Sequence, residues 1–142
     1  MNIFICQKCG HIEFNSAPQN CPVCNATQFK QNDKVFDESM EKSREGAVKH
    51  IPKVQIVQKC GLIPEESCID IIVRIGETLH PMMENHFIQF IDCYVDEKYV
   101  SRIFLTPDMN PAVILHLKSN GSKVAIVENC NIHGYWKTEA NL

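Results

Sequence analysis

The sequence predicts a mainly β protein in which an antiparallel β-sandwich follows a small N-terminal metal-binding knob. Two Cys-x-x-Cys units lie near the N-terminus, and paired units of this kind are typical of sites that bind one metal ion. From Val54 onward, six or seven short runs rich in β-branched residues alternate with turn signals, which is the pattern of an antiparallel sandwich. We find no convincing long helix and no internal repeat in this second part.

Composition and charge exclude several classes of protein. The 142 residues suffice for one modest domain with a small appendage, and a hydrophobic fraction of 44% is enough for a packed core. A formal net charge of -3 argues against nucleic acid or an anionic membrane as a partner. No apolar stretch approaches the length needed to cross a bilayer. The N-terminus shows no signal-peptide pattern, so the expected compartment is the cytoplasm.

Four cysteines of the N-terminal stretch form two matched units, each followed by a residue that tolerates a left-handed backbone. Glycine adopts positive φ freely and asparagine is the next most tolerant residue, so each unit can wrap a tight turn around an ion. Without a signal peptide, metal binding explains these cysteines better than disulfides do. Four thiolates suit a tetrahedral zinc or iron ion, which would supply folding energy that about thirty residues lack. The units are Cys6-Gln7-Lys8-Cys9-Gly10 and Cys21-Pro22-Val23-Cys24-Asn25.

A charged stretch separates the knob from the sandwich. Between Gln31 and Gly46 apolar residues become few and charged residues frequent. This composition favours a solvated connector, with room for a short helix from Ser39 to Glu45. We therefore divide the chain into residues 1–34 as the metal module, 35–46 as the linker and 47–142 as the sandwich domain.

The sandwich domain also carries cysteines and a histidine to which we assign no ligand role. Cys60, Cys68 and Cys93 lie within or beside the apolar runs, and we expect them to be reduced core residues. His116 stands alone in its run, so a structural or surface role is expected. The runs that predict strands are Val54–Val57, Ser67–Ile75, His86–Val95, Tyr99–Thr106, Ala112–Leu117 and Lys123–Val127.

Three further motifs supply four histidines and one cysteine as candidate metal ligands. Four imidazoles can occupy a plane around an ion, and one thiolate can bind on the axis and leave the opposite position open. A structural zinc site closes at four ligands, so five ligands favour a reactive iron. The thiolate would push electron density toward whatever binds at the open position, as it does in cysteine-ligated haem enzymes. The motifs are Lys49-His50-Ile51-Pro52, His80-Pro81-Met82-Met83-Glu84-Asn85-His86 and Cys130-Asn131-Ile132-His133-Gly134-Tyr135-Trp136.

These motifs resemble the iron-site motifs of superoxide reductases, the desulfoferrodoxin and neelaredoxin family, from about residue 46 to residue 139. The resemblance implies an immunoglobulin-like sandwich and a non-haem iron with four histidines in the plane and a cysteine on the axis. It also implies the one-electron reduction of superoxide to hydrogen peroxide at ferrous iron, with re-reduction by an external donor of the rubredoxin type. Family members are commonly dimers or tetramers, so a homo-oligomer is expected. The implied ligands are His50, His80, His86, His133 and Cys130.

Lys49 directly precedes the first implied ligand, as in the family pattern. We expect its positive charge to draw superoxide, a small anion, to the site and to order a water that supplies protons.

The knob resembles the rubredoxin-like module of rubrerythrins, which has the same Cys-Pro-x-Cys unit and a later aromatic, here Phe29. That resemblance implies iron, whereas a zinc ribbon has nearly the same signature. Two features depart from desulfoferrodoxins. Pro22 and Val23 separate two cysteines that are adjacent there. Val48 replaces a glutamate that caps the sixth iron position of the oxidised family site, and valine cannot ligate.

Two other functions remain as alternatives. The chain could be an electron-transfer protein with two iron centres, in which case the main site would be coordinatively saturated. It could instead be a zinc-binding interaction module, in which the knob docks a partner and the main site is closed. An open coordination position distinguishes superoxide chemistry from both.

Overall fold

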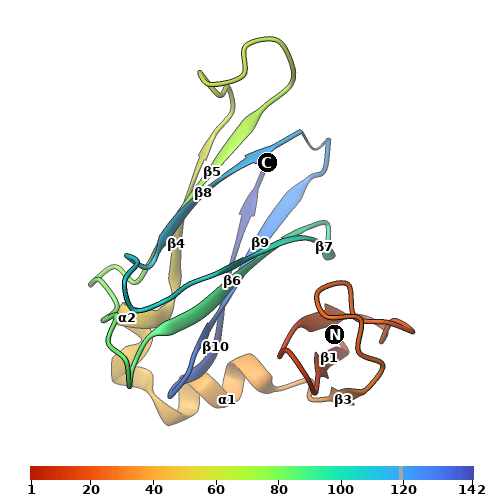
Figure 1. The fold of residues 1–142 in the computed structure, drawn as a ribbon, viewed down its shortest axis with the longest axis vertical. Coiled ribbons are helices and arrows are strands. Elements are labelled where there is room, and N and C mark those ends of the chain that lie inside the picture. Colours follow the sequence, from red (N-terminus) through yellow and green to blue (C-terminus); the bar gives the residue numbers. More distant parts are fainter. Residues whose placement is uncertain (119) are drawn as a thin grey trace.

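A computed structural model describes residues 1–118 and 120–142 and shows a knob, a helical connector and a β-sandwich (Figure 1). The knob holds a small antiparallel sheet in the order β2-β1-β3. One Cys-x-x-Cys unit lies at the turn between the first two strands and the other lies in the loop before the third. The strands are β1 (Ile3–Cys6), β2 (Ile12–Phe14) and β3 (Phe29–Gln31).

Two antiparallel sheets form the sandwich, with strand orders β4-β5-β8 and β10-β9-β6-β7. The expected fold class is therefore confirmed, and each of the six expected runs overlaps a strand. The last strand was not expected, because its sequence Gly-Tyr-Trp-Lys-Thr-Glu-Ala-Asn is largely polar. The bounds are β4 (Pro52–Val57), β5 (Ile69–Ile75), β6 (Ile88–Val95), β7 (Lys98–Phe104), β8 (Ala112–Leu117), β9 (Lys123–Cys130) and β10 (Gly134–Asn141).

The main core lies between the two sheets and reaches the last residue of β9. Ile71 and Val73 of β5 pack in the same cluster as Ile91 and Cys93 of β6. Alternate residues of a strand face opposite sides, so a strand with one core-facing row normally shows a solvent-facing row. In β6 almost every residue is buried, because the knob covers its other face. Cys130 belongs to the main core and is 2% exposed.

The knob packs against the outer face of β6 and β9. Ile3, Ile12 and Phe14 of the knob form a second apolar cluster with Tyr94 and Val127 of the sandwich. Three polar side chains of the sandwich also donate to backbone carbonyls of the knob. They are Tyr94 Oη to Ile12 O at 2.7 Å, Tyr135 Oη to Gly10 O at 2.7 Å and Arg102 Nη1 to Cys9 O at 2.9 Å.

The connector consists of α1 (Val35–Lys42), a 3₁₀ turn η1 (Arg44–Gly46) and α2 (Ala47–His50). The helix therefore begins at Val35 and not at Ser39. Val35 and Ser39, one turn apart, are its buried residues, and Ser39 Oγ accepts a hydrogen bond from the backbone of Tyr135 at 3.1 Å. Because the remaining positions are largely charged or polar, the composition resembles that of a solvated connector although one face packs on β10. Among the described residues, no helix has the length and apolarity needed to span a bilayer.

Candidate metal centre

Four histidine rings meet in a closed cycle at the end of the sandwich beside α2. Neighbouring ring centroids are 4.7 Å apart for His50–His80, 4.7 Å for His80–His86, 5.0 Å for His86–His133 and 4.8 Å for His133–His50. Each ring is nearly perpendicular to its neighbours, with interplanar angles of 69°, 78°, 69° and 75°. The distance across the cycle, from His50 to His86, is 6.3 Å. Four similar sides and a longer diagonal describe a square of imidazoles around a common centre.

Hydrogen bonds to carbonyls fix the orientation of two of these rings. His50 Nδ1 lies 2.6 Å from Gly46 O, and His80 Nδ1 lies 2.6 Å from Pro81 O. A carbonyl can only accept, so each Nδ1 carries a proton and each neutral ring presents an Nε2 lone pair. The two Nε2 atoms face each other at 3.2 Å. This tautomer is the one that a metal bound through Nε2 requires.

A third nitrogen in the cycle has no hydrogen-bond partner among the described residues. His86 Nε2 is buried and unsatisfied, and an unpaired buried polar atom costs about 1–3 kcal/mol. Burial also lowers the pKa of His86, and the charges of His133 and Lys49 lower it further, so the ring is held neutral. A metal ion at the centre of the square would accept all three Nε2 lone pairs, so the donor set fits a metal.

Cys130 adds a sulfur from the core side of the square. Its Sγ lies 3.8 Å from His133 Nδ1, and one ligand atom from each of Cys130, His50, His80 and His86 lies within 4.8 Å of the others. Burial raises the pKa of the Cys130 thiol, while the backbone amides of His133 and Ile132 act in the opposite direction and would stabilise a metal-bound thiolate. The structure thus brings all five sequence-predicted ligands together.

The two sides of the square differ in their access to solvent. Cys130 is buried on one side, whereas His86 and His133 are half-buried and Lys49 is exposed. Val48, directly before Lys49, is 44% exposed. Solvent therefore reaches the square beside His86 and His133, whereas the sulfur is buried.

Two residues of the last motif hold the ligand loops in place, a role that sequence reasoning missed. Trp136 stacks on His50 with centroids 4.9 Å apart and donates from Nε1 to His133 O at 3.1 Å. Asn131 accepts from the backbone of Phe87 at 3.0 Å and donates to Asn85 O at 3.1 Å, which ties the histidine loop to the cysteine turn. Both residues lie inside the motif that begins at Cys130, and this position was the sequence signal that could have indicated their role.

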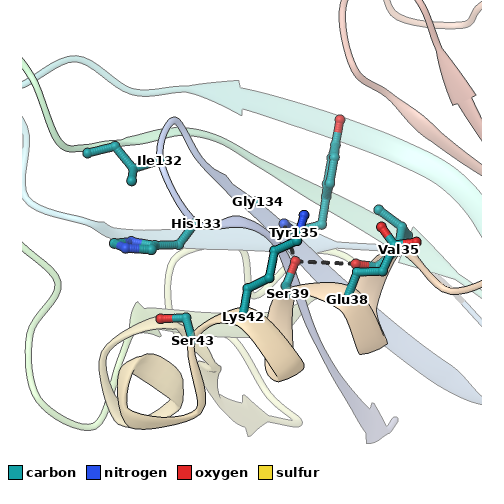
Figure 2. A pocket seen from close by; sticks show the side chains of 9 residues that line it. All are labelled: Val35, Glu38, Ser39, Lys42, Ser43, Ile132, His133, Gly134 and Tyr135. Carbon is teal, nitrogen blue, oxygen red and sulfur yellow. Dashed lines mark hydrogen bonds between the residues drawn. The ribbon is translucent and has the colours of Figure 1, made fainter.

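A small pocket lies between α1 and the turn that carries His133 (Figure 2). Ser39 and Lys42 of the helix face Gly134 and Tyr135 across it. Gly134 has a φ of +77°, and a Cβ there would lie 2.8 Å from Ser39 Oγ. Glycine is therefore needed both for the chain reversal after His133 and for the close approach of α1.

Glu128, two residues before Cys130, is a buried carboxyl that no motif indicated. Both of its oxygens lack a hydrogen-bond partner among the described residues. Burial raises its pKa well above the ordinary value, although the backbone amide of Cys130 acts in the opposite direction. Burial therefore favours the uncharged form of this carboxyl.

The four cysteines of the knob also converge. Sγ atoms are 3.6 Å apart for Cys6–Cys24 and 3.6 Å for Cys9–Cys21, close to the roughly 3.8 Å edge of a sulfur tetrahedron with metal–sulfur bonds of about 2.3 Å. Burial raises the pKa of the Cys6 thiol, but the backbone amides of Cys9 and Lys8 outweigh it and lower that pKa to about 7. The knob is therefore arranged for a tetrahedral metal ion.

Backbone conformation supports the same conclusion. Gly10 and Asn25, the residues after each second cysteine, have φ values of +76° and +65°. The left-handed turns expected from the sequence are confirmed.

Four more donors meet where no site was expected. His116 is exposed, as expected, but its Nδ1 lies 3.3 Å from Cys60 Sγ and 2.7 Å from Asp70 Oδ1. Cys68 Sγ lies 3.7 Å from the same nitrogen. Cys60, Cys68 and Cys93 are all free and buried, as expected, and Cys93 lies in the main core, apart from this cluster.

Comparison with known proteins identifies the family. Residues 39–139 match the desulfoferrodoxin family, and residues 4–30 match the rubrerythrin rubredoxin-like domain. A desulfoferrodoxin of Desulfarculus baarsii is 28% identical over 141 residues, which cover 98% of this chain and 96% of the relative.

Solved structures agree with this result. The superoxide reductase from Nanoarchaeum equitans has a TM-score of 0.56 at 28% identity, over 66% of this chain and 93% of the other. The superoxide reductase from Treponema pallidum has a TM-score of 0.63 at 19% identity, over 96% and 98%, and this match supports the fold alone. With its cluster of four histidines and one cysteine and its four-cysteine knob, the chain belongs to the desulfoferrodoxin family, in which it carries a rubrerythrin-type rubredoxin-like domain at its N-terminus.

Proposed function

We propose that this protein is a superoxide reductase, an oxidoreductase that converts superoxide, one electron and two protons into hydrogen peroxide. The observation that carries this proposal is the square of four imidazoles with a buried sulfur on one side and solvent on the other. These five side chains would hold a non-haem iron, and a small substrate could reach it from the solvent side. We assign the ligand roles to His50, His80, His86, His133 and Cys130.

The protein's own residues would prepare this site in two ways. The carbonyls of Gly46 and Pro81 hold two histidines as neutral Nε2 donors. The packed core behind Cys130 keeps water away from the sulfur side, so substrate reaches the site from the outward side. Non-haem iron held by these ligands would supply the electron that superoxide takes. The protons come from solvent on the exposed side, near Lys49.

Product analysis tests the proposed function. The full-length, iron-loaded protein is reduced and mixed with superoxide without a donor. We expect one hydrogen peroxide for each superoxide consumed and no dioxygen, with turnover only after a reduced rubredoxin is added. Release of dioxygen would show dismutation instead. If superoxide disappeared no faster than with zinc-loaded protein, the protein would not be a superoxide reductase, and the electron-transfer function would remain.

The charge of Lys49 is expected to speed the encounter with superoxide. One unit charge at about 4 Å is worth about 1 kcal/mol in water, so Lys49→Ala should slow the second-order reaction roughly three- to tenfold. The rate should also depend less on ionic strength, because salt screens this attraction. Pulse radiolysis at several salt concentrations measures both effects.

Lys98→Ala is the matched control, because Lys98 is exposed and lies at the opposite end of the β6–β7 hairpin from the metal centre. It removes the same charge from the protein and should leave the rate nearly unchanged. Equal effects of the two substitutions would show that only the net charge matters.

We further propose a rubredoxin-type donor, a homo-oligomeric assembly and the cytoplasm as the compartment, where reducing conditions keep thiols available for metals. The knob would relay electrons if it holds iron. In support, Tyr135 joins the two sites, since its Oη donates to Gly10 O at 2.7 Å and it lies two residues after His133.

A further inference from the structure

A cluster of metal-ligating side chains lies at the other end of the sandwich from the histidine centre. Cys60 and Cys68 flank the long loop between β4 and β5, at the top of Figure 1. The histidine centre lies beyond the opposite end of β4, and six strand residues span about 20 Å. We propose that Cys60, Cys68, Asp70 and His116 bind a zinc ion as a third metal site that is structural and separate from the reaction.

Strand register places two of these donors side by side. Asp70 of β5 is the direct cross-strand partner of His116 of β8, and side chains at opposed positions share one face of the sheet. The backbone amide of Cys60 donates to Cys68 O at 3.0 Å, which closes the loop and brings both sulfurs to the same end. One ligand atom of each residue lies within 4.8 Å of the other three.

The distances fit a tetrahedral metal site in which a proton shared by His116 and Asp70 occupies the place of the ion. His116 Nδ1 lies 3.3 Å and 3.7 Å from the two sulfurs, near the roughly 3.5 Å edge that zinc bonds of about 2.0–2.3 Å require. The contact of Nδ1 with Asp70 Oδ1 is shorter, at 2.7 Å, because a hydrogen bond joins them. An ion that replaces this proton would contact all four donors.

A backbone amide already points at one of the sulfurs. The amide of Leu62 donates to Cys60 Sγ at 3.3 Å. In the knob, the amide of Lys8 contacts the sulfur of Cys6 with the same two-residue offset. Such amides stabilise thiolates, which are the metal-binding form of cysteine. This contact prepares Cys60 as a ligand independently of the convergence of the four side chains.

Ligand chemistry selects the ion and its role. Two thiolates, one imidazole and one carboxylate form a mixed set that suits zinc, and four protein ligands leave no open position. Cys60 and Cys68 are 3% and 7% exposed, while the side chains of His116 and Asp70 are 34% and 19% exposed. The thiolates are thus shielded, and the ion can enter from the side of the histidine. Bound zinc would pin the β4–β5 loop to β8.

Metal analysis of the full-length protein tests this site. Iron-loaded protein is reduced, equilibrated with excess zinc and freed of loose metal with a moderate chelator. We expect the double variant Cys60→Ser/Cys68→Ser, and separately His116→Ala, to hold one zinc per chain less than the native protein. Cys93→Ala, which removes a buried cysteine outside the cluster, should keep the native content. The visible iron spectrum should stay unchanged in all variants and reports that each one folds.

A second measurement uses the native protein and needs no variant. Zinc should slow alkylation of Cys60 and Cys68 and hydrogen exchange in residues 58–68, and a strong chelator should reverse both effects. Equal zinc content in native protein and variants would overturn the proposal. A further test alkylates the protein directly in a reducing lysate. A disulfide between Cys60 and Cys68 under these conditions would also overturn the proposal. Neither result bears on the superoxide reaction, so this proposal fails or holds separately from the proposed function.

Discussion

Substitution of Cys130 by serine is expected to abolish superoxide reduction, with a loss of more than about a hundredfold in rate. Loss of an outer-shell partner already costs a metal site about 10–100-fold, and this change removes a direct ligand. Serine is a hard and weakly acidic donor, so the electron-rich thiolate is lost. The thiolate-to-iron absorption of the main site should disappear together with turnover. Visible spectra of oxidised protein and pulse-radiolysis rates measure the two effects.

Cys93→Ser is the matched control for this substitution. Cys93 lies on the adjacent strand β6, faces the same core as Cys130 and is 0% exposed. It should lower stability without changing the iron spectrum. The knob contributes thiolate bands of its own if it holds iron, so the readout is the difference spectrum between the native protein and each variant. If the Cys130→Ser protein kept the thiolate-to-iron absorption band of the main site, Cys130 would not be a ligand of that site.

The convergence of the four histidines and Cys130 could be predicted because each of these residues lies in a short motif that bends the chain. His80 and His86 share one loop that Pro81 stiffens, and Cys130 and His133 share one turn. Local spacing of this kind is visible in the sequence, and it limits where the side chains can point. The fold class could be predicted for a similar reason, since β-branched runs with turns between them specify strands without long-range information.

The parts that could not be predicted depend on contacts between distant residues. Cys60 and His116 are 56 positions apart, and they meet because β5 pairs with β8 and because Cys60 N bonds to Cys68 O beside the start of β5. Similarly, β10 is a strand because it pairs with β9 along its full length, not because of its own composition. In α1 the buried face is only two residues wide, which is too narrow to stand out among charges.

Docking of the knob depends on a buried polar network that sequence patterns do not reveal. Asp92 is 0% exposed and accepts from Arg102 Nε at 2.6 Å and from Arg102 Nη2 at 2.8 Å. His11 of the knob contacts the same carboxylate at 3.3 Å and Glu13 at 2.6 Å. Burial lowers the pKa of His11, but the two carboxylates outweigh it and raise that pKa above the ordinary value. The network therefore balances two negative charges against two positive ones.

Removal of Arg102 should destabilise the protein by about 3–5 kcal/mol, because Asp92 would remain buried without its main partner. Arg102→Met keeps much of the apolar stem but removes the guanidinium, whose central carbon lies 3.5 Å from the centroid of the Phe90 ring. It removes the two bonds to Asp92 and the bond to Cys9 O. We therefore expect the free energy of unfolding, from urea titration of the metal-loaded protein, to fall and hydrogen exchange in the knob to rise.

Two further variants separate lost charge balance from lost packing. Arg74→Met is the control, because Arg74 is exposed on β5 and donates to the nearby carbonyls of Gly76 and Glu77; it should change stability by less than about 1 kcal/mol. Adding Asp92→Asn to Arg102→Met removes the uncompensated charge and should recover part of the loss. The loss in free energy of unfolding of the double variant is compared with the sum of the losses of the two single variants. If the two were equal, the penalty would come from packing, because independent effects add whereas paired charges couple.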